Sequence, residues 1–131
     1  MSDLLAILDP LVGTPWNPPE FDCWGFLRTV YLGAYEIDLP RLGHVAGDRV
    51  VDATFAGEEA GSGRWQPVER AQLGDAVAMG RGGRLHHCGI WLTGDLIAHC
   101  SQPFGVTVAA RRNLVALGWG SFRFYRHRDR P

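Results

Sequence analysis

The sequence predicts a single α+β domain in which helices near the N-terminus pack on a small antiparallel sheet. Apolar residues recur at helical spacing after Cys23, and the chain after residue 75 is mostly short apolar segments separated by turn residues. The 131 residues, of which 46% are hydrophobic and 21% charged, suffice for one ordinary core. We therefore expect one domain over residues 1–131, with its helices and strands segregated along the chain.

A short helix is expected close to the N-terminus, within residues 1–12. Ser2 is a suitable N-cap, and the apolar residues that follow it continue to Leu8. Pro10 should end this helix, because proline lacks the amide hydrogen that an interior helical position donates. Three further prolines between residues 14 and 19 disfavour helix in that stretch.

The main helix should begin near Cys23 and end around Tyr35. Asp22 is a good N-cap, so Cys23 falls in the first helical turn. Apolar residues follow at i, i+3, i+4 and i+7, the spacing of an amphipathic helix. They are Leu27, Val30, Tyr31 and Ala34.

Residues 41–70 carry a weak pattern and are interpreted as a variable insertion. Within it, residues 50–55 indicate a helix and residues 57–63 a flexible loop. Beyond the insertion, short apolar segments bounded by glycine and polar residues predict strands, with a turn at residues 80–83. The predicted strands are 76–79, 87–92, 96–100, 105–109 and 119–125.

Two of these strands should form a hairpin closed by residues 93–95. With a three-residue loop, Leu92 faces Leu96, and the same register places His99 opposite Gly89. His87 is then a diagonal neighbour of His99 on the same face, at a Cα separation of roughly 7–8 Å. Cys88 and Cys100 pair on the other face, which should face a core.

The charge of the chain limits its classes of partner. A formal net charge of −1 argues against a nucleic-acid binder. No apolar run reaches the roughly 20 residues of a membrane span, and the first residues lack the features of a signal peptide. We therefore expect the protein to stay inside the cell that makes it, or to leave it by a route other than standard secretion. Arginines are concentrated in residues 111–131. This basic segment is interpreted either as a solvated end of the chain or as an arm that docks an acidic partner.

Cys23 is the candidate nucleophile. Unpaired N–H groups and the helix dipole at a helix start favour a negative charge, and thiolate is the reactive form of cysteine. Nucleophilic catalysis also needs a base and a group that orients the base. His87 fits the first role and His99 the second, because a neutral His99 can accept a hydrogen bond from one ring N–H of His87.

Other readings of these side chains remain. Cys23 can be a small buried hydrophobe, and each histidine an ordinary strand residue. Potential zinc ligands are also present, although neighbouring strand residues point to opposite faces and cannot share one ion. These ligands are Cys23, His86, His87, Cys88, His99 and Cys100. A Cys88–Cys100 disulfide is geometrically conceivable but does not suit a reducing compartment.

Four segments in order resemble the NlpC-type cell-wall peptidases. They are FDCWG at 21–25, GDAV at 74–77, HCGIWL at 87–92 and LIAH at 96–99. The resemblance extends over about residues 11–126 and implies a papain-like fold with a Cys-His-His triad. It implies that Cys23, His87 and His99 hydrolyse an amide in the stem peptides of peptidoglycan without a metal or cofactor.

The resemblance also implies residues that contact the substrate. Asp22 would bind a substrate amino group, and the backbone N–H of Cys23 would stabilise the oxyanion. Trp16 stands where many relatives have a tyrosine near the oxyanion site, and Trp24 stands where many have a serine. Both aromatic residues are therefore candidate substrate contacts, although neither carries the relatives' hydroxyl.

The segment pattern is most similar to versions from bacteriophage tails and related tail-like particles such as gene transfer agents. Its signs are DCWG at 22–25, LP at 39–40, GV at 105–106 and FYR at 124–126. This likeness implies a virion protein, assembled in the host cytoplasm with other tail-tip or baseplate proteins, that helps a tail breach the wall. The alternatives are a structural tail component with a weak or inactive site, and an acyltransferase that uses the same triad.

Overall fold

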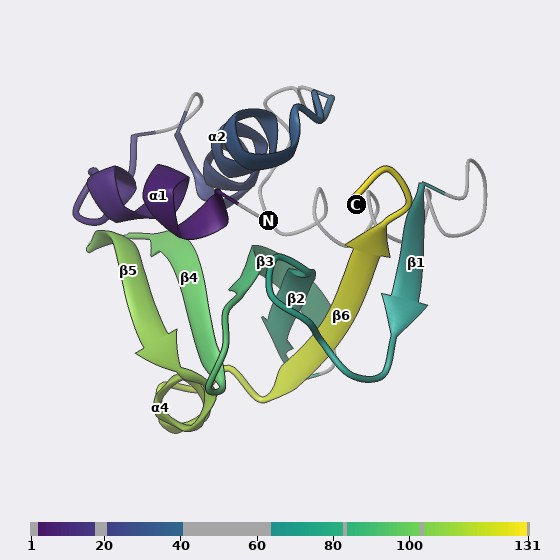
Figure 1. The fold of residues 1–131 in the computed structure, drawn as a ribbon. Helices are drawn as coiled ribbons and strands as arrows, with labels where there is room; N and C mark the ends of the chain where they lie inside the picture. The colour runs from purple at the N-terminus through teal and green to yellow at the C-terminus, as the bar shows by residue number, and fades with distance from the viewer. Residues whose placement is uncertain (1–2, 18–20, 41–63, 83, 103, 131) are drawn as a thin grey trace.

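The structure is a computed structural model that describes residues 3–17, 21–40, 64–82, 84–102 and 104–130. Its helices are α1 (Leu4–Leu8), α2 (Cys23–Tyr35) and α4 (Arg111–Ala116), with a short 3-10 turn at Asp9–Leu11. Its strands are β1 (Trp65–Val68), β2 (Ala76–Arg81), β3 (Arg84–Trp91), β4 (Leu96–Ser101), β5 (Gly105–Ala110) and β6 (Ser121–His127). Figure 1 shows α1 and α2 together, well separated from α4. The predicted α+β class is confirmed.

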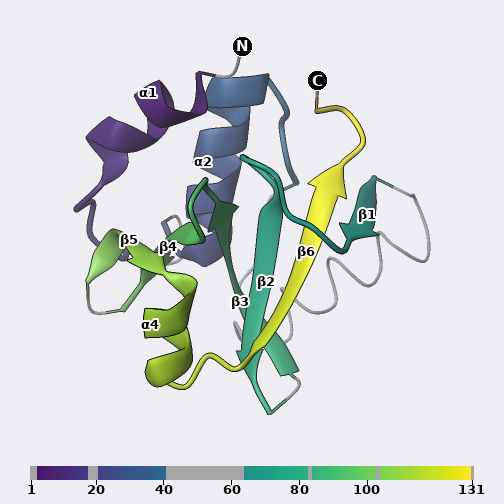
Figure 2. The same ribbon diagram turned by 60° about the horizontal axis from the view of Figure 1, so that its bottom comes forward.

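The strands form one antiparallel sheet in the order β1-β6-β2-β3-β4-β5. Figure 2 shows this order across the sheet, from β5 at one edge to β1 at the other. The hairpin of β3 and β4 therefore lies inside the sheet, flanked by β2 and β5. His99 is therefore paired with Gly89 on one side and with Thr107 on the other, and His87 is paired with Met79 of β2.

Helix α2 begins and ends where the sequence predicts. The Asp22 side chain accepts a hydrogen bond from the Gly25 N–H at 2.8 Å, which caps the helix at Cys23. The buried face of α2 includes Phe26, Leu27 and Val30, and it packs on β3 and β4. Helix capping and burial together hold the first turn of α2 against the hairpin.

The hairpin has the predicted register. Gly89 faces His99, and the Leu92 N–H donates to the Leu96 carbonyl oxygen at 2.8 Å. Cys88 and Cys100 belong to the core that includes α2. A Cβ atom at Gly89 would lie 2.6 Å from the carbonyl oxygen of Ala98, so the close approach of the two strands requires glycine.

Several boundaries differ from the prediction. Strands β2 and β3 extend to Arg81 and Arg84, so the turn between them is shorter than residues 80–83, and the last strand begins at Ser121 rather than at residue 119. Strand β1 lies within the segment interpreted as an insertion, and α4 within the basic segment; neither was expected. Ser2, the expected helix at 50–55 and the expected loop at 57–63 lie outside the described residues.

The two readings of the basic C-terminal segment are wrong for two of its arginines, which point inward. Arg126 donates to both carboxylate oxygens of the fully buried Asp75, at 3.0 and 2.7 Å, and Arg130 donates to the same carboxylate. The Gln72 N–H adds a bond of 2.7 Å to that group. A buried charge needs hydrogen-bond or ionic partners, and these contacts supply them for Asp75. They also connect the end of β6 to the loop before β2.

The segment before α2 is anchored to β5. The Gly13 N–H donates to the Val106 carbonyl oxygen at 2.9 Å, and the Val106 N–H donates to Thr14 at 3.0 Å. Gly105 has a φ of +73°, and a Cβ atom there would lie 2.1 Å from the Thr14 oxygen. Glycine at 105 thus allows the loop that leads to Cys23 to lie beside the sheet. In the described residues, no helix is long and apolar enough to cross a membrane.

Candidate active site

Cys23, His87 and His99 come from three elements and meet where α2 begins. Cys23 is the first residue of α2 and is partly buried, while His87 on β3 and His99 on β4 are 7% and 5% exposed. Nε2 of His87 lies 2.9 Å from Nδ1 of His99, and the two rings are nearly perpendicular at 83°. The sequence-predicted nucleophile, base and orienting group are therefore neighbours.

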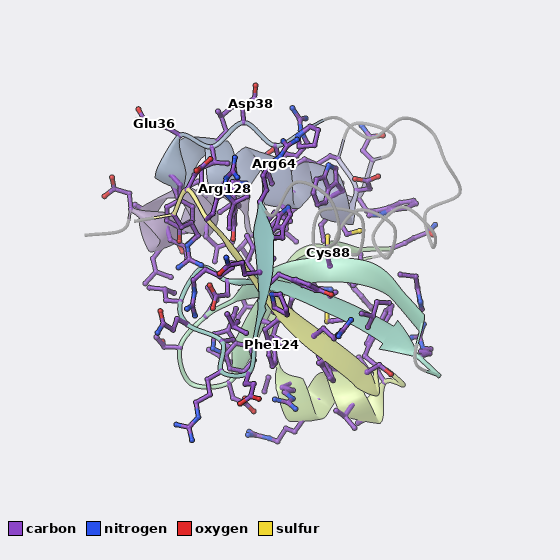
Figure 3. All side chains as sticks on the ribbon, turned by 90° about the vertical axis from the view of Figure 1, so that its right-hand side faces the viewer. Glu36, Asp38, Arg64, Cys88, Phe124 and Arg128 are labelled. Atoms are coloured by element: carbon purple, nitrogen blue, oxygen red, sulfur yellow. The ribbon has the colours of Figure 1, made fainter. Side chains whose placement is uncertain are left out.

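Cys88 is a further member of this cluster. It is fully buried on β3, next to His87 in the chain, and Cys23 packs against the core to which it belongs. In Figure 3, Cys88 lies where the sheet meets the helices. Cys88 faces a core, as predicted, and α2 belongs to the same core and packs on β3.

The surroundings of Cys23 favour its thiolate. A hydrogen bond from the Cys88 thiol lowers the pKa of Cys23 well below its ordinary value, and the His87 imidazole and the Cys88 backbone lower it further, against the opposing effect of burial. The same bond and burial raise the pKa of the Cys88 thiol. The helix N-terminus acts in the same direction on Cys23. Of the two thiols, Cys23 is therefore the more acidic.

Removing the Cys88 donor should make Cys23 less acidic. In a Cys88→Ala variant, we expect the alkylation of Cys23 by iodoacetamide to need a higher pH than in the wild type. Cys88→Ser keeps a donor and should restore part of the difference. Alkylation rates measured from pH 5 to 10 with peptide mass mapping test this, and superimposable profiles for all three proteins would contradict it.

His99 is held as a neutral ring. Burial, and then the charge of His87, lower the pKa of His99 to about 4. Its Nε2 lies 3.5 Å from Oγ1 of Thr107 on β5. With its proton on Nε2, His99 donates to Thr107 and accepts at Nδ1 from the Nε2–H of His87. The other nitrogen of His87 is then available to Cys23.

The lowered pKa of His99 should make folding stability depend on pH. Between about pH 4 and 6.5 the unfolded chain holds a proton on His99 that the folded chain lacks, so stability rises with pH across this range. From pH 7 to pH 4, the wild type should lose about 3 kcal/mol more unfolding free energy than His99→Asn, which does not titrate there. Urea denaturation at several pH values measures the difference, and parallel stability curves would refute it.

A groove of about 630 Å³ lies beside the first turns of α2. Its lining comes from the anchored loop and from one side of α2: Thr14, Pro15, Trp16, Asn17, Phe21, Gly25, Arg28 and Thr29. Trp16, a predicted substrate contact, is half-buried in its wall. The groove thus gives an extended ligand room next to the start of the helix.

The other two predicted substrate contacts have structural partners. Asp22 is half-buried and caps α2 with one carboxylate oxygen. Trp24 is 5% exposed, packs in the main core and donates its indole N–H to the Pro40 carbonyl oxygen at 2.8 Å. The structure therefore places Trp16 in the groove and Trp24 in the core.

Sequence reasoning did not assign a role to three neighbours of the cluster, namely Cys88, Thr107 and Trp119. The alternation of β3 indicated the face of Cys88, and the position of Thr107 opposite His99 follows from pairing with β5. Nothing in the local sequence indicates the ring contact between Trp119 and His87. Among the described residues, no three His, Cys, Asp or Glu side chains form a group that could hold a metal ion.

A stabilised thiolate at a helix start, a histidine beside it and a second histidine that orients the first define a site of the cysteine-peptidase class. The chain belongs to the NlpC/P60 family, whose model matches residues 13–116. Members of this family are cysteine peptidases of peptidoglycan, so both the predicted resemblance and the predicted enzyme class are confirmed at the level of the family.

Three known proteins are similar to this chain. Protein P54 of Enterococcus faecium is 33% identical over 97 residues, which are 70% of this chain and 16% of that protein. The crystal structure of the NlpC/p60 domain of the peptidoglycan hydrolase SagA is 28% identical with a TM-score of 0.59, covering 92% of this chain and 94% of that one. A lipoprotein-like NLP/P60 structure from Staphylococcus aureus subsp. aureus Mu50 shares the fold at 24% identity and a TM-score of 0.54, covering 92% of this chain and 40% of that one.

Proposed function

We propose that this protein is a cysteine peptidase that hydrolyses an amide bond in the stem peptides of peptidoglycan. The observation that carries the proposal is the position of Cys23, the first residue of α2, beside His87, whose Nε2 is bonded to Nδ1 of His99 at 2.9 Å. The likeness to the NlpC/p60 domain of SagA, a peptidoglycan hydrolase, supports the substrate class.

We assign each group of the site a role in the reaction. The Cys23 thiolate attacks the amide carbonyl, and the backbone N–H of Cys23, at the first helical position, stabilises the oxyanion. The proton that the Cys23 thiol has passed to His87 then goes to the leaving amine, and the acyl group stays on sulfur as a thioester. In the second half of the reaction, His87 takes a proton from a water molecule, and the oxygen of that water attacks the thioester carbonyl. The carbon–sulfur bond breaks, the peptide is released as a carboxylic acid, and Cys23 is again a thiolate with the proton on His87.

The groove and Asp22 supply contacts for the substrate. The Trp16 ring offers an apolar wall to an extended peptide. Asp22 uses one carboxylate oxygen for the helix cap, and the second oxygen of the carboxylate can accept a bond from a substrate ammonium group. Trp24 contributes through the core, by holding the chain at Pro40 against α2.

Digestion of purified peptidoglycan tests the proposal. The expected products are soluble fragments with newly freed amino and carboxyl groups in the stem peptide, identified by mass spectrometry. Protein alkylated with iodoacetamide at Cys23 is the matched control and should release none. Fragments cut only in the glycan strand, or equal release by the alkylated protein, would overturn the assignment.

We propose further that the protein acts in a bacteriophage tail or a tail-like particle, where it helps the tail breach the wall. The support is the DCWG form at 22–25 together with the segments at 39–40, 105–106 and 124–126, which resemble tail-associated versions. Its partners would be tail-tip or baseplate proteins, assembled with it in the host cytoplasm. Detection in purified particles by mass spectrometry and immunogold labelling tests this; particles that lack the protein would contradict it.

One observation favours a second function, that of a structural tail component with a weak or inactive site. The position that many relatives fill with a serine holds Trp24, which packs in the core. A structural role predicts particles that assemble normally with Cys23→Ala and fail to assemble without the protein. An enzymatic role predicts complete particles that adsorb but infect poorly when Cys23 is replaced.

A further inference from the structure

One indole contacts both histidines of the His86-His87 pair. The rings of Trp119 and His87 are nearly parallel, at an angle of 25°, and their centroids are 5.0 Å apart. The His86 ring lies 5.2 Å from the same indole. The guanidinium carbon of Arg81 lies 3.9 Å from the indole centroid, which is a cation–π distance. Trp119 thus connects the candidate base to a cation at the end of β2.

The backbone around Trp119 is fixed on both sides. The backbone N–H of Trp119 donates to the Leu114 carbonyl oxygen at 3.0 Å, and the backbone N–H of Gly120 donates to the Gly80 carbonyl oxygen at 3.1 Å. Arg81 donates from its guanidinium to the Leu117 carbonyl oxygen at 3.3 Å. The indole is therefore presented to β3 by a turn that is bonded both to α4 and to the sheet.

His87 needs two constraints to aim one nitrogen at Cys23. The bond to His99 fixes one edge of the imidazole, but the ring can still tilt about the line that joins the two nitrogens. A flat aromatic surface stacked against the ring removes this tilt. We propose that Trp119 is a positioning residue that holds the His87 ring in the plane in which its free nitrogen points at Cys23.

Arg81 stabilises the position of the Trp119 indole. Its guanidinium stacks on the indole and donates a hydrogen bond to the Leu117 carbonyl oxygen. These two contacts hold the indole against the hairpin. Among the described residues, titratable groups near His87 include Cys23 from α2, His99 from β4, and its chain neighbours His86 and Cys88 on β3. This inference rests on the proposed function, because it concerns the acid–base group of that site.

Three variants test the inference. In Trp119→Ala, kcat for peptidoglycan cleavage should fall roughly 10–100-fold with KM nearly unchanged, the size of effect expected for a misplaced catalytic group. Trp119→Phe keeps an aromatic face and should recover most of the loss. Trp91→Ala is the matched control, because it removes a different indole of the same sheet. The Trp91 indole contacts Phe124. The kcat of this control variant should stay near that of the wild type.

A spectroscopic measurement separates this inference from the proposed function. In protein labelled with ¹⁵N-histidine, the ring nitrogens of His87 should give sharp, distinct signals in the wild type, in Trp119→Phe and in Trp91→Ala. In Trp119→Ala they should broaden or average, because the ring is free to tilt. If the wild type fails to cleave peptidoglycan, this readout still decides the role of Trp119. Unchanged His87 signals in a folded Trp119→Ala protein would overturn the inference.

Discussion

Replacing Cys23 with serine should reduce peptidoglycan hydrolysis by about three orders of magnitude or more, without loss of the fold. The thiolate at this position depends on the Cys88 thiol and the His87 imidazole, and a serine hydroxyl stays protonated in the same surroundings. Serine and cysteine also have similar helix propensities, so the start of α2 should be unaffected. Rates of fragment release, with circular dichroism as the check on folding, measure the effect.

Cys100 provides the control for this replacement. It is fully buried on β4, and burial raises the pKa of its thiol to about 11. Cys100→Ala should therefore retain activity, because that thiol does not ionise near neutral pH. Substantial cleavage by Cys23→Ser, or a loss of cleavage in a folded Cys100→Ala protein, would show that Cys23 is not the nucleophile.

Replacing Asp75 with asparagine should lower the free energy of unfolding by about 3–5 kcal/mol, the cost of breaking a buried ion pair from one side. Asparagine has nearly the same shape but no charge, so Arg130, whose side chain is 8% exposed, keeps a buried positive charge without its counterion. Arg126 loses the same partner. Thermal and urea denaturation measure the loss.

An exposed aspartate supplies the comparison for Asp75. Asp38 lies 3.6 Å from Arg28, and its side chain is 78% exposed. Asp38→Asn should change the free energy of unfolding by less than about 1 kcal/mol, because water screens that pair. A similar loss of unfolding free energy in both variants would mean that burial of the Asp75 carboxylate does not determine how much it contributes to stability.

The sequence allowed the central hairpin and the nucleophile helix to be predicted because both depend on local rules. A capping aspartate set the start of α2 at Cys23, and a three-residue loop set the register that places His99 opposite Gly89. Strand alternation then gave the face of each histidine. These rules act over a few residues, so no knowledge of the rest of the fold was needed.

The remaining features depend on partners that are distant in the chain. Strand β1 contains Pro67 and is short, so it forms as an edge strand only because β6 pairs with it. In the sequence, Arg126 and Arg130 belong to a basic C-terminal segment. Only the fold shows that both donate to the carboxylate of Asp75. Trp119 reaches His87 through the turn after α4, and no spacing rule connects those two positions.

The separation along the chain between the histidine pair and Cys23 has a consequence for the order of folding. His87 and His99 are 12 residues apart in one hairpin, whereas Cys23 comes from a helix far earlier in the chain. Local contacts form before distant ones, because closing a long loop costs more entropy. The Cys23 thiol stays unactivated until α2 docks on β3. Nucleophilic reactivity is therefore acquired late, and a partly folded chain carries an ordinary cysteine.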